Sequence, residues 1–271
     1  MKVSIIVAAY NEAPTITPLL EQVWAQPIPA SAKEIIVVES NSTDGTRAQV
    51  ERFIESHAGD PARSVRAIYE AGPRGKGRAV RQGIAAASGD VLLIQDADLE
   101  YDVRDYPALI GPIAEDRADF VLGSRHLGAD RWNIRTFADR SLQSALMNVG
   151  GILFHGFFNR VFGVRLSDPT TMYKVFRARC LDGLVLSCNR FDFDYELVGK
   201  LIRCGFMPLE VPVAYRSRGF HEGKKIRVLR DPLTWVLAIL KCRFAELRPA
   251  SRAALGEAAA YRENPARHAS S

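Results

Sequence analysis

Two aspartates separated by one residue follow an apolar run, and their type and spacing fit the binding of a divalent cation. Asp96 and Asp98 come directly after residues 91–95, and Glu100 lies two positions further on. In an extended segment, residues i and i+2 point to the same side, so we expect both carboxylates to face one point. Carboxylate oxygens select Mg²⁺ or Mn²⁺, which bind through one or two carboxylates together with substrate phosphates. The alternative is a solvated turn.

Polar residues also follow three other apolar runs. Tyr10 and Glu12 come after the first run, Glu39 begins a polar segment after the second, and Arg125 ends the Gly-Ser-Arg that follows the fifth. In an open α/β sheet, ligands bind beyond the carboxyl ends of the strands. We therefore expect these residues and the two aspartates to converge on one edge of a sheet.

The elements that must position these residues alternate between strands and helices. Nearly continuous apolar runs are typical of parallel strands covered on both faces. They predict strands at residues 3–8, 34–38, 65–69, 91–95 and 120–122. Amphipathic segments between them predict helices at 13–26, 44–57, 77–87 and 105–116. Repeated strand–helix–strand units give a mainly parallel, Rossmann-like sheet flanked by helices, so the predicted fold class is α/β.

The second half of the chain follows a different pattern. Helices are predicted at 140–162, 191–204 and 233–247, and a strand at 207–215, whose Pro208 and Pro212 suit an edge position. Residues 249–271 lack periodicity, which favours a disordered tail. The predicted organisation is one domain over residues 1–226, an amphipathic helix within 227–248 and the tail over 249–271.

Composition excludes several classes of protein. Hydrophobic residues make up 47% of the 271-residue chain and charged residues 25%, which excludes a disordered or fibrous protein. The four cysteines and five histidines have no metal-ligand spacing; we expect His57 and His268 at the surface and His155 satisfied within a helix. Without a signal-peptide pattern or an apolar run of the ~18 residues that cross a bilayer, the chain is expected to be cytoplasmic.

Positive charge is concentrated near the C-terminal end. Nine lysines and arginines lie between Arg216 and Arg248 against three acidic residues, although the net charge of the whole chain is only +5. Such a zone attracts phosphates. The helix predicted at 233–247 has an apolar body edged by cations, which is typical of a helix lying on anionic lipid. The alternatives are a solvated helical face and a helix packed on the domain.

A glycine-rich segment precedes the third predicted helix. Residues 72–77 read Gly-Pro-Arg-Gly-Lys-Gly, which resembles a phosphate-binding loop but lacks the Walker spacing and the Ser or Thr after Lys76. A phosphate loop and a tight strand–helix turn both stay open.

Taken in order, these segments resemble a known enzyme family. Ala-Tyr-Asn-Glu at 9–12, the polar segment at 37–46, Gly-Lys-Gly-x-Ala-x-x-x-Gly at 75–83, Asp-Ala-Asp-Leu-Glu at 96–100 and Gly-Ser-Arg at 123–125 are similar to the motifs of family 2 glycosyltransferases with the GT-A fold. Asp-Pro-Thr-Thr-Met-Tyr-Lys at 168–174, the acidic segment 191–197 and the segment 211–224 resemble those of dolichol-phosphate or polyprenyl-phosphate sugar synthases. The resemblance covers residues 1–245.

The resemblance implies an inverting, Mg²⁺- or Mn²⁺-dependent transfer of a sugar from a GDP- or UDP-linked donor. The acceptor that it favours is a polyprenyl phosphate, and it implies no nucleic-acid partner. By position, the nucleotide sugar would be held by Ala8, Tyr10, Glu12, Val38, Glu39, Lys76, Asp96, Ala97 and Asp98. The cation would be bound by Asp96, Asp98 and Glu100, and the diphosphate and acceptor phosphate by Arg125, Arg218 and Lys224.

The resemblance leaves the acceptor and the donor base open. A hydroxyl acceptor needs a base, for which Asp168 is the first candidate and Asp192 and Asp194 the next, whereas a lipid phosphate is already an anion. Asp98, Arg125 and Asp168 are thus the expected catalytic residues. The family usually has Pro where this chain has Ala8, and it usually has Asp-Asp where this chain has Glu39-Ser40. The alternatives are a saccharide or small-molecule hydroxyl as acceptor, a nucleotidyltransferase, and a non-catalytic nucleotide-binding relative.

Overall fold

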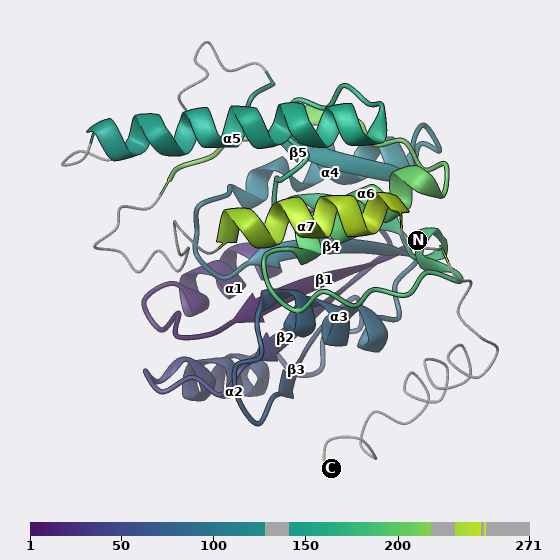
Figure 1. Ribbon diagram of the computed structural model, residues 1–271. Coiled ribbons are helices and arrows are strands. Elements are labelled where there is room, and N and C mark those ends of the chain that lie inside the picture. Colours follow the sequence, from purple (N-terminus) through teal and green to yellow (C-terminus); the bar gives the residue numbers. More distant parts are fainter. Residues whose placement is uncertain (128–140, 218–230, 245–246, 248–271) are drawn as a thin grey trace.

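A computed structural model of the protein describes residues 1–127, 141–217, 231–244 and 247. Within these residues, seven strands form one sheet in the order β3-β2-β1-β4-β6-β5-β7 (Figure 1). In chain order the strands are β1 (Lys2–Ala9), β2 (Ala32–Glu39), β3 (Arg63–Tyr69), β4 (Val91–Asp96), β5 (Phe120–Ser124), β6 (Lys174–Arg177) and β7 (Leu209–Pro212).

All of these strands except β6 run in the same direction. β1 pairs in parallel with β2 and β4, β2 with β3, and β5 with β7. β6 lies antiparallel between β4 and β5, so these two again share a direction. The carboxyl ends of the six parallel strands therefore lie at one edge of the sheet, which we call the carboxyl edge.

Helices cover the sheet on both faces, as its buried strands require. They are α1 (Ile16–Ala25), α2 (Thr46–Ser56), α3 (Lys76–Ala86), α4 (Tyr106–Ala114), α5 (Ser141–Phe162), α6 (Phe193–Arg203) and α7 (Asp231–Phe244), with short 3₁₀ turns at Val103–Asp105 and Ala178–Leu181. α3 packs on β1 and β2, while α5, α6 and α7 pack on one another (Figure 1). Phe158 of α5 and Tyr195 of α6 lie within this second layer, and their ring centroids are 6.1 Å apart.

The predicted α/β class is confirmed, and the five predicted strands of the first half are present. The strand predicted at 207–215 is shortened to β7, which lies at the sheet edge as its prolines suggested. β6 was not predicted, because its four residues, Lys-Val-Phe-Arg, are too few to show a period and begin and end with a cation. The sheet is consequently mixed at this one strand.

The C-terminal predictions are covered only in part. The described part of the helix predicted at 233–247 is α7, and the tail at 249–271 lies outside the described residues. None of the helices in the described part of the chain combines the length and apolar character needed to span a bilayer. The proposed division at residues 226 and 248 stays a prediction.

Gly77 of α3 lies very close to the start of α6, and a substitution at this position tests that packing. A Cβ at this position would lie 2.5 Å from the Cβ of Phe193 and within 2.8 Å of the carbonyl oxygens of Cys188 and Arg190. Because these atoms cannot rotate away, Gly77→Ala is expected to lower the free energy of unfolding by about 1–3 kcal/mol. Urea denaturation followed by circular dichroism measures the loss.

Gly150→Ala in α5 is the matched control. Apart from the backbone of its own helix, a Cβ there meets no atom of the described residues within 4 Å, so the added methyl group is expected to stabilise the helix by up to about 1 kcal/mol. Equal unfolding free energies for Gly77→Ala and the wild type would contradict the close packing.

Candidate active site

The carboxyl edge brings together the strand ends that the sequence singles out. Ala8 lies between Val38 of β2 and Asp96 of β4, and the next residue of β1, Ala9, lies beside Glu39. The last two residues of β1 are therefore small, and each has a carboxylate residue beside it on a neighbouring strand, Asp96 on β4 and Glu39 on β2. These carboxylates end two of the strands at the carboxyl edge.

The loop after β1 is tied to the segments that follow β2 and β4. Glu12 is buried, and its backbone N–H donates to Thr46 Oγ1 at 2.9 Å. The hydroxyl of Thr15 donates to the carbonyl oxygen of Ala97 at 2.6 Å. Tyr10, between β1 and these anchors, is half-buried. The predicted nucleotide-binding residues of this loop therefore lie at the carboxyl edge in a fixed segment.

Glu39 carries a buried acceptor atom that lacks a partner. The side chain is fully buried, and its Oε1 accepts a hydrogen bond from the backbone N–H of Ser42 at 2.6 Å. Its Oε2 has no hydrogen-bond partner among the described residues. An unsatisfied buried acceptor costs about 1–3 kcal/mol, and native proteins rarely leave one without a reason. The atom is suited to receive an N–H group from a ligand.

Asp96 is held by a row of alternating charges. Lys76 Nζ lies 2.8 Å from Asp96 Oδ1 and 3.9 Å from Asp194 Oδ2, and the buried Lys174 donates to Asp194 Oδ1 at 2.7 Å. Burial by itself would lower the pKa of Lys76, but the carboxylates of Asp194 and Asp96 raise it above its ordinary value. The ammonium group therefore stays charged beside the first aspartate of the Asp-x-Asp pair.

The other two acidic residues lie in a tight turn after β4. Leu99 has a φ of 57°, a left-handed conformation that costs a non-glycine residue about 1–3 kcal/mol and is typical of functional sites. Asp98 Oδ1 accepts the backbone N–H of Glu100 at 3.2 Å. The charge of Asp98 also contributes to the raised pKa of Lys76, after burial and the larger effects of Asp194 and Asp96. Asp96 and Asp98 therefore lie within electrostatic reach of one ammonium group.

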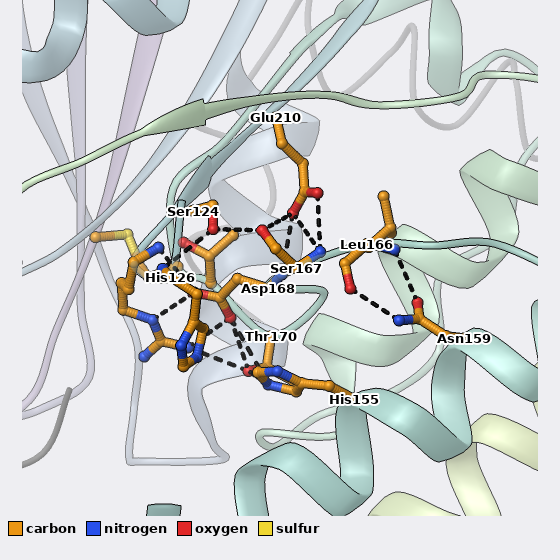
Figure 2. Close-up of polar contacts among 12 residues, drawn as sticks. Ser124, His126, His155, Asn159, Leu166, Ser167, Asp168, Thr170 and Glu210 are labelled. Carbon is orange, nitrogen blue, oxygen red and sulfur yellow. Dashed lines mark hydrogen bonds and ion pairs between the residues drawn. The ribbon is translucent and has the colours of Figure 1, made fainter. Parts of the chain in front are cut away.

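A buried ion pair lies beyond the end of β5 (Figure 2). Arg125 Nε donates to Asp168 Oδ2 at 2.6 Å and its Nη2 to Oδ1 at 2.8 Å. The Asp168 side chain is completely buried and that of Arg125 is 7% exposed. Burial alone would raise the pKa of Asp168, but the charge and hydrogen bonds of Arg125 hold it well below its ordinary value. The guanidinium is thereby fixed in one orientation.

Glu210 of β7 supports the loop that carries Asp168 (Figure 2). Its carboxylate accepts hydrogen bonds from the backbone N–H groups of Ser167 and Asp168 and from the Ser167 hydroxyl, at 2.8–3.0 Å. Ser167 also shares a hydrogen bond of 2.6 Å with Ser124, at the end of β5. The loop is thus anchored to two neighbouring strands.

Tyr215 connects Arg125 to Asp96, Asp98 and Glu100 at the end of β4, which we call the acidic turn. Its hydroxyl donates to Glu100 Oε2 at 2.7 Å, and its ring centroid lies 5.2 Å from Arg125 Cζ. The ring of Tyr101 lies on the guanidinium as well, at 5.9 Å. Both distances fit cation–π contacts. The carboxylates after β4 and the cation after β5 therefore belong to one continuous site.

Two of the three candidate bases are engaged in ion pairs. Asp168 is bound by Arg125, and Asp194 by Lys174 and Lys76; for Asp194 too, the two cations outweigh burial and lower the pKa. Asp192 lies at the N-cap position of α6, and its Oδ1 accepts the backbone N–H of Arg190, which precedes the helix, at 2.9 Å. This geometry does not favour Asp168 or Asp194 as a proton acceptor. The predicted phosphate-binding residues Arg218 and Lys224 lie outside the described residues.

Comparison with known proteins identifies the family. A profile described as Glycosyl transferase family 2 matches residues 4–182. The chain belongs to this family.

Relatives of this glycosyltransferase include polyprenyl-phosphate enzymes. The dolichol-phosphate mannosyltransferase of Pyrococcus furiosus is 25% identical over 83% of this chain and 61% of its own. The dolichyl-phosphate beta-glucosyltransferase of Drosophila melanogaster is 31% identical over 73% of this chain and 62% of its own. The chain spans between 37% and 62% of the length of such curated relatives. The resemblance inferred from the sequence is confirmed.

The fold has solved counterparts. The glucosyl-3-phosphoglycerate synthase of Mycobacterium tuberculosis, solved with Mn²⁺, uridine diphosphate and phosphoglyceric acid, matches with a TM-score of 0.58 and 20% identity over 90% of this chain and 79% of its own. The mannosyl-3-phosphoglycerate synthase of Rubrobacter xylanophilus matches with a TM-score of 0.56 and 17% identity, over 92% and 77%. The predicted GT-A fold is confirmed.

The site is also fixed by residues that the sequence analysis did not single out. Lys174 neutralises Asp194, Glu210 holds the Asp168 loop, and Tyr215 connects the acidic turn to Arg125. Lys174 begins a strand of only four residues, which is too short to predict its burial. All three residues act through tertiary contacts, for which the sequence has no local pattern.

Asp168→Asn tests the buried pair. Removing one charge leaves Arg125 buried and uncompensated, so the free energy of unfolding at pH 7 is expected to fall by about 3–5 kcal/mol. Because the folded pKa lies below the unfolded value of about 3.9, the contribution of the pair is present above that pH and is lost as the pH falls below it. Urea denaturation at neutral and acidic pH should show the difference between wild type and variant shrinking in acid.

Asp102→Asn is the control for this prediction. Asp102 also binds an arginine in bidentate fashion, but its partner Arg104 is 82% exposed. Solvent screens such a pair, so only a small loss is expected at either pH. A similar loss in both variants would contradict a special contribution from the buried pair.

Proposed function

We propose that this glycosyltransferase transfers a sugar, with inversion, from a GDP- or UDP-linked donor to a polyprenyl phosphate. The observation that carries the proposal is the continuous site at the carboxyl edge, where Tyr215 joins the acidic turn at Glu100 to Arg125. Relatives that are named for transfer to dolichol phosphate support the acceptor, and the neighbour solved with Mn²⁺ and uridine diphosphate supports the donor and the ion.

Asp96, Asp98 and Glu100 are the residues we assign to Mg²⁺ or Mn²⁺. The fit rests on their chemistry: all three offer carboxylate oxygens, the donors that these hard ions prefer, and Asp96 ends β4 while Asp98 and Glu100 follow it. When bound, the ion stabilises the charge that develops on the departing nucleoside diphosphate. Lys76, charged and 2.8 Å from Asp96, adds a fixed positive charge at the same place.

Glu39 is the residue we assign to the nucleobase. Its unpartnered Oε2 can accept the ring N–H that both uracil and guanine offer. The buried carboxylate therefore supports a base with such a group and leaves the choice between the two to experiment. The rest of the nucleotide sugar would be held by Ala8, Tyr10, Glu12, Val38 and Ala97.

Arg125 is the residue we assign to the phosphate groups. Its bonds to Asp168 use Nε and Nη2, and Nη1 lies outside the pair. A guanidinium held in one orientation binds phosphate oxygens without first losing conformational freedom. By resemblance, Arg218 and Lys224 would complete the phosphate site. Because Asp168 and Asp194 are both held in ion pairs, an acceptor that is already an anion suits the site better than a hydroxyl.

Two helices supply an apolar surface for peripheral contact with an anionic membrane. Leu153 of α5 is 68% exposed, and Leu237 and Phe244 of α7 are 66% and 78% exposed. α5 and α7 lie side by side (Figure 1), and the exposed cations Lys241 and Arg243 are on α7. Apolar residues edged by cations suit the interface of an anionic bilayer. Such contact would bring a lipid-linked phosphate to the carboxyl edge.

Asp98→Asn tests the cation and the reaction together. Loss of one carboxylate is expected to lower kcat at least about 100-fold, because stabilisation of the leaving group is lost. The assay measures nucleoside diphosphate released from UDP- and GDP-sugars, with Mn²⁺, in the presence and absence of polyprenyl phosphate. Asp90→Asn, at the opposite end of the same strand, is the matched control and should keep wild-type turnover.

The assay has two outcomes that would refute the proposal. Full turnover by Asp98→Asn would remove the metal role from this residue. Release of nucleoside diphosphate that does not depend on polyprenyl phosphate, but does depend on a saccharide or a small alcohol, would replace the proposed acceptor.

Flotation with anionic liposomes tests the membrane surface. The wild type is expected to float at low salt, and Leu153→Asp with Leu237→Asp is expected to reduce the floating fraction, since both changes place a charge where apolar contact is proposed. Tyr69→Asp is the control, because Tyr69 is 37% exposed on β3, at the far edge of the sheet from β7. Equal flotation of the double variant and the wild type would refute this surface.

A further inference from the structure

Two histidines that are far apart in the sequence meet at Asp168. His126 follows Arg125 after β5, and His155 lies on α5 (Figure 2). One possible ligand atom from each histidine and from Asp168 lies within 4.8 Å of the others. His155 Nε2 is 3.8 Å from Asp168 Oδ1, and the two imidazole rings have centroids 5.4 Å apart. His155 is a satisfied helical residue, as predicted, and its partners Thr170 and Asp168 come from the loop before β6.

We propose that His126, His155 and Asp168 bind one transition-metal ion such as Zn²⁺, at a second site separate from the acidic turn. Two imidazole nitrogens and one carboxylate form a donor set that suits Zn²⁺, Co²⁺ or Ni²⁺. Mg²⁺, which prefers oxygen ligands, is not suited to it. The acidic turn has the opposite preference, because Asp96, Asp98 and Glu100 offer only oxygen.

The three ligand atoms are already close to the spacing that an ion requires. With metal–ligand bonds of about 2.0–2.2 Å, two ligands of a tetrahedral ion lie roughly 3.4 Å apart. The His155–Asp168 pair, at 3.8 Å, is near that separation, and no pair of the three ligand atoms, which lie within 4.8 Å of one another, must approach by more than about 1.4 Å. The hydroxyl of Thr170, now 3.0 Å from His155 Nε2, would have to turn aside. His155 and Asp168 are buried, and His126 is half-buried and gives the ion access from solvent.

The ion would compete with Arg125 for Asp168. Both oxygens of this carboxylate accept hydrogen bonds from the guanidinium, and a divalent cation beside Arg125 would be repelled unless the guanidinium moved away. Binding is therefore expected to release Arg125 from its fixed orientation. On the proposed function, in which Arg125 binds phosphate, Zn²⁺ at this site would inhibit sugar transfer.

Titration of the full-length chain with Co²⁺ tests the binding directly. The visible ligand-field bands of Co²⁺ report nitrogen ligands and a reduced coordination number, and the measurement requires no turnover. Wild type and Asp98→Asn, which lacks an intact acidic turn, are both expected to bind one Co²⁺ with these bands. His126→Asn and His155→Asn are expected to lose the bands and to bind at least about tenfold more weakly, the loss that even an outer partner of a metal ligand causes.

His57→Asn is the matched control, since His57 stacks on Phe53 in another part of the fold, and it should titrate like the wild type. Thermal unfolding without metal confirms that each variant is folded; His126, being half-buried, keeps the test valid if His155→Asn does not fold. Bands that persist in the His126 variant, or that vanish in Asp98→Asn, would overturn the proposal.

Inhibition is measured separately, in transfer assays saturated with Mg²⁺. Zn²⁺ is expected to inhibit the wild type and His57→Asn, and to require at least about tenfold more ion for His126→Asn. Inhibition that is equal in the wild type and His126→Asn would overturn the competition with Arg125. If no donor supports transfer at all, the proposed function fails, while the Co²⁺ titration still decides whether the site exists.

Discussion

The ion pair between Arg125 and Asp168 buries two opposite charges beneath the carboxyl edge. Because buried charges need partners in good geometry, the segments that carry these partners are held in fixed positions. An isolated buried carboxylate costs several kcal/mol, which is offset only when both oxygens are satisfied with good geometry. Here Arg125 binds both, and Thr170 Oγ1 donates to one of them at 3.2 Å. Glu210 then holds the adjoining backbone against β7. The pair thereby fixes one cation relative to three segments that are distant in sequence.

The same principle acts on the other side of the site. Lys76 is charged beside Asp96 because Asp194 lies behind it, and Asp194 in turn is compensated by Lys174 on β6. Two sets of compensated charges therefore approach the turn after β4, one from α3 and α6 and one from β5 and the Asp168 loop. Such charges are oriented before any ligand arrives, so they stabilise a developing anion without the reorganisation that water would require.

The sequence predicted the strand ends that carry the site, but it predicted little of the tertiary contacts that hold the charged side chains in place. The ends of β1, β2, β4 and β5 could be predicted because buried parallel strands leave continuous apolar runs, and the residue after each run is then at the carboxyl edge. β6 left no such run, so the connection from Lys174 to Asp194 could not be foreseen. His126 and His155 are likewise 29 positions apart, and only the packing of α5 beside the end of β5 brings them to Asp168. Contacts of this kind depend on the tertiary fold and leave no periodic pattern.

The charge state of the buried carboxylates bears on which nucleophile the site can use. A general base is most effective when its pKa is near the working pH. Asp168 has a pKa below its ordinary value of about 3.9, because the charge of Arg125 outweighs the effect of burial. Its pKa is therefore roughly three or more units below neutrality. Since each unit corresponds to about 1.36 kcal/mol, protonating Asp168 at pH 7 would cost at least ~4 kcal/mol. Accepting that proton would also leave Arg125 buried without its partner. On the proposed function, a phosphate nucleophile would avoid both costs, because it would carry its negative charge into a site where Arg125 is already held in one orientation.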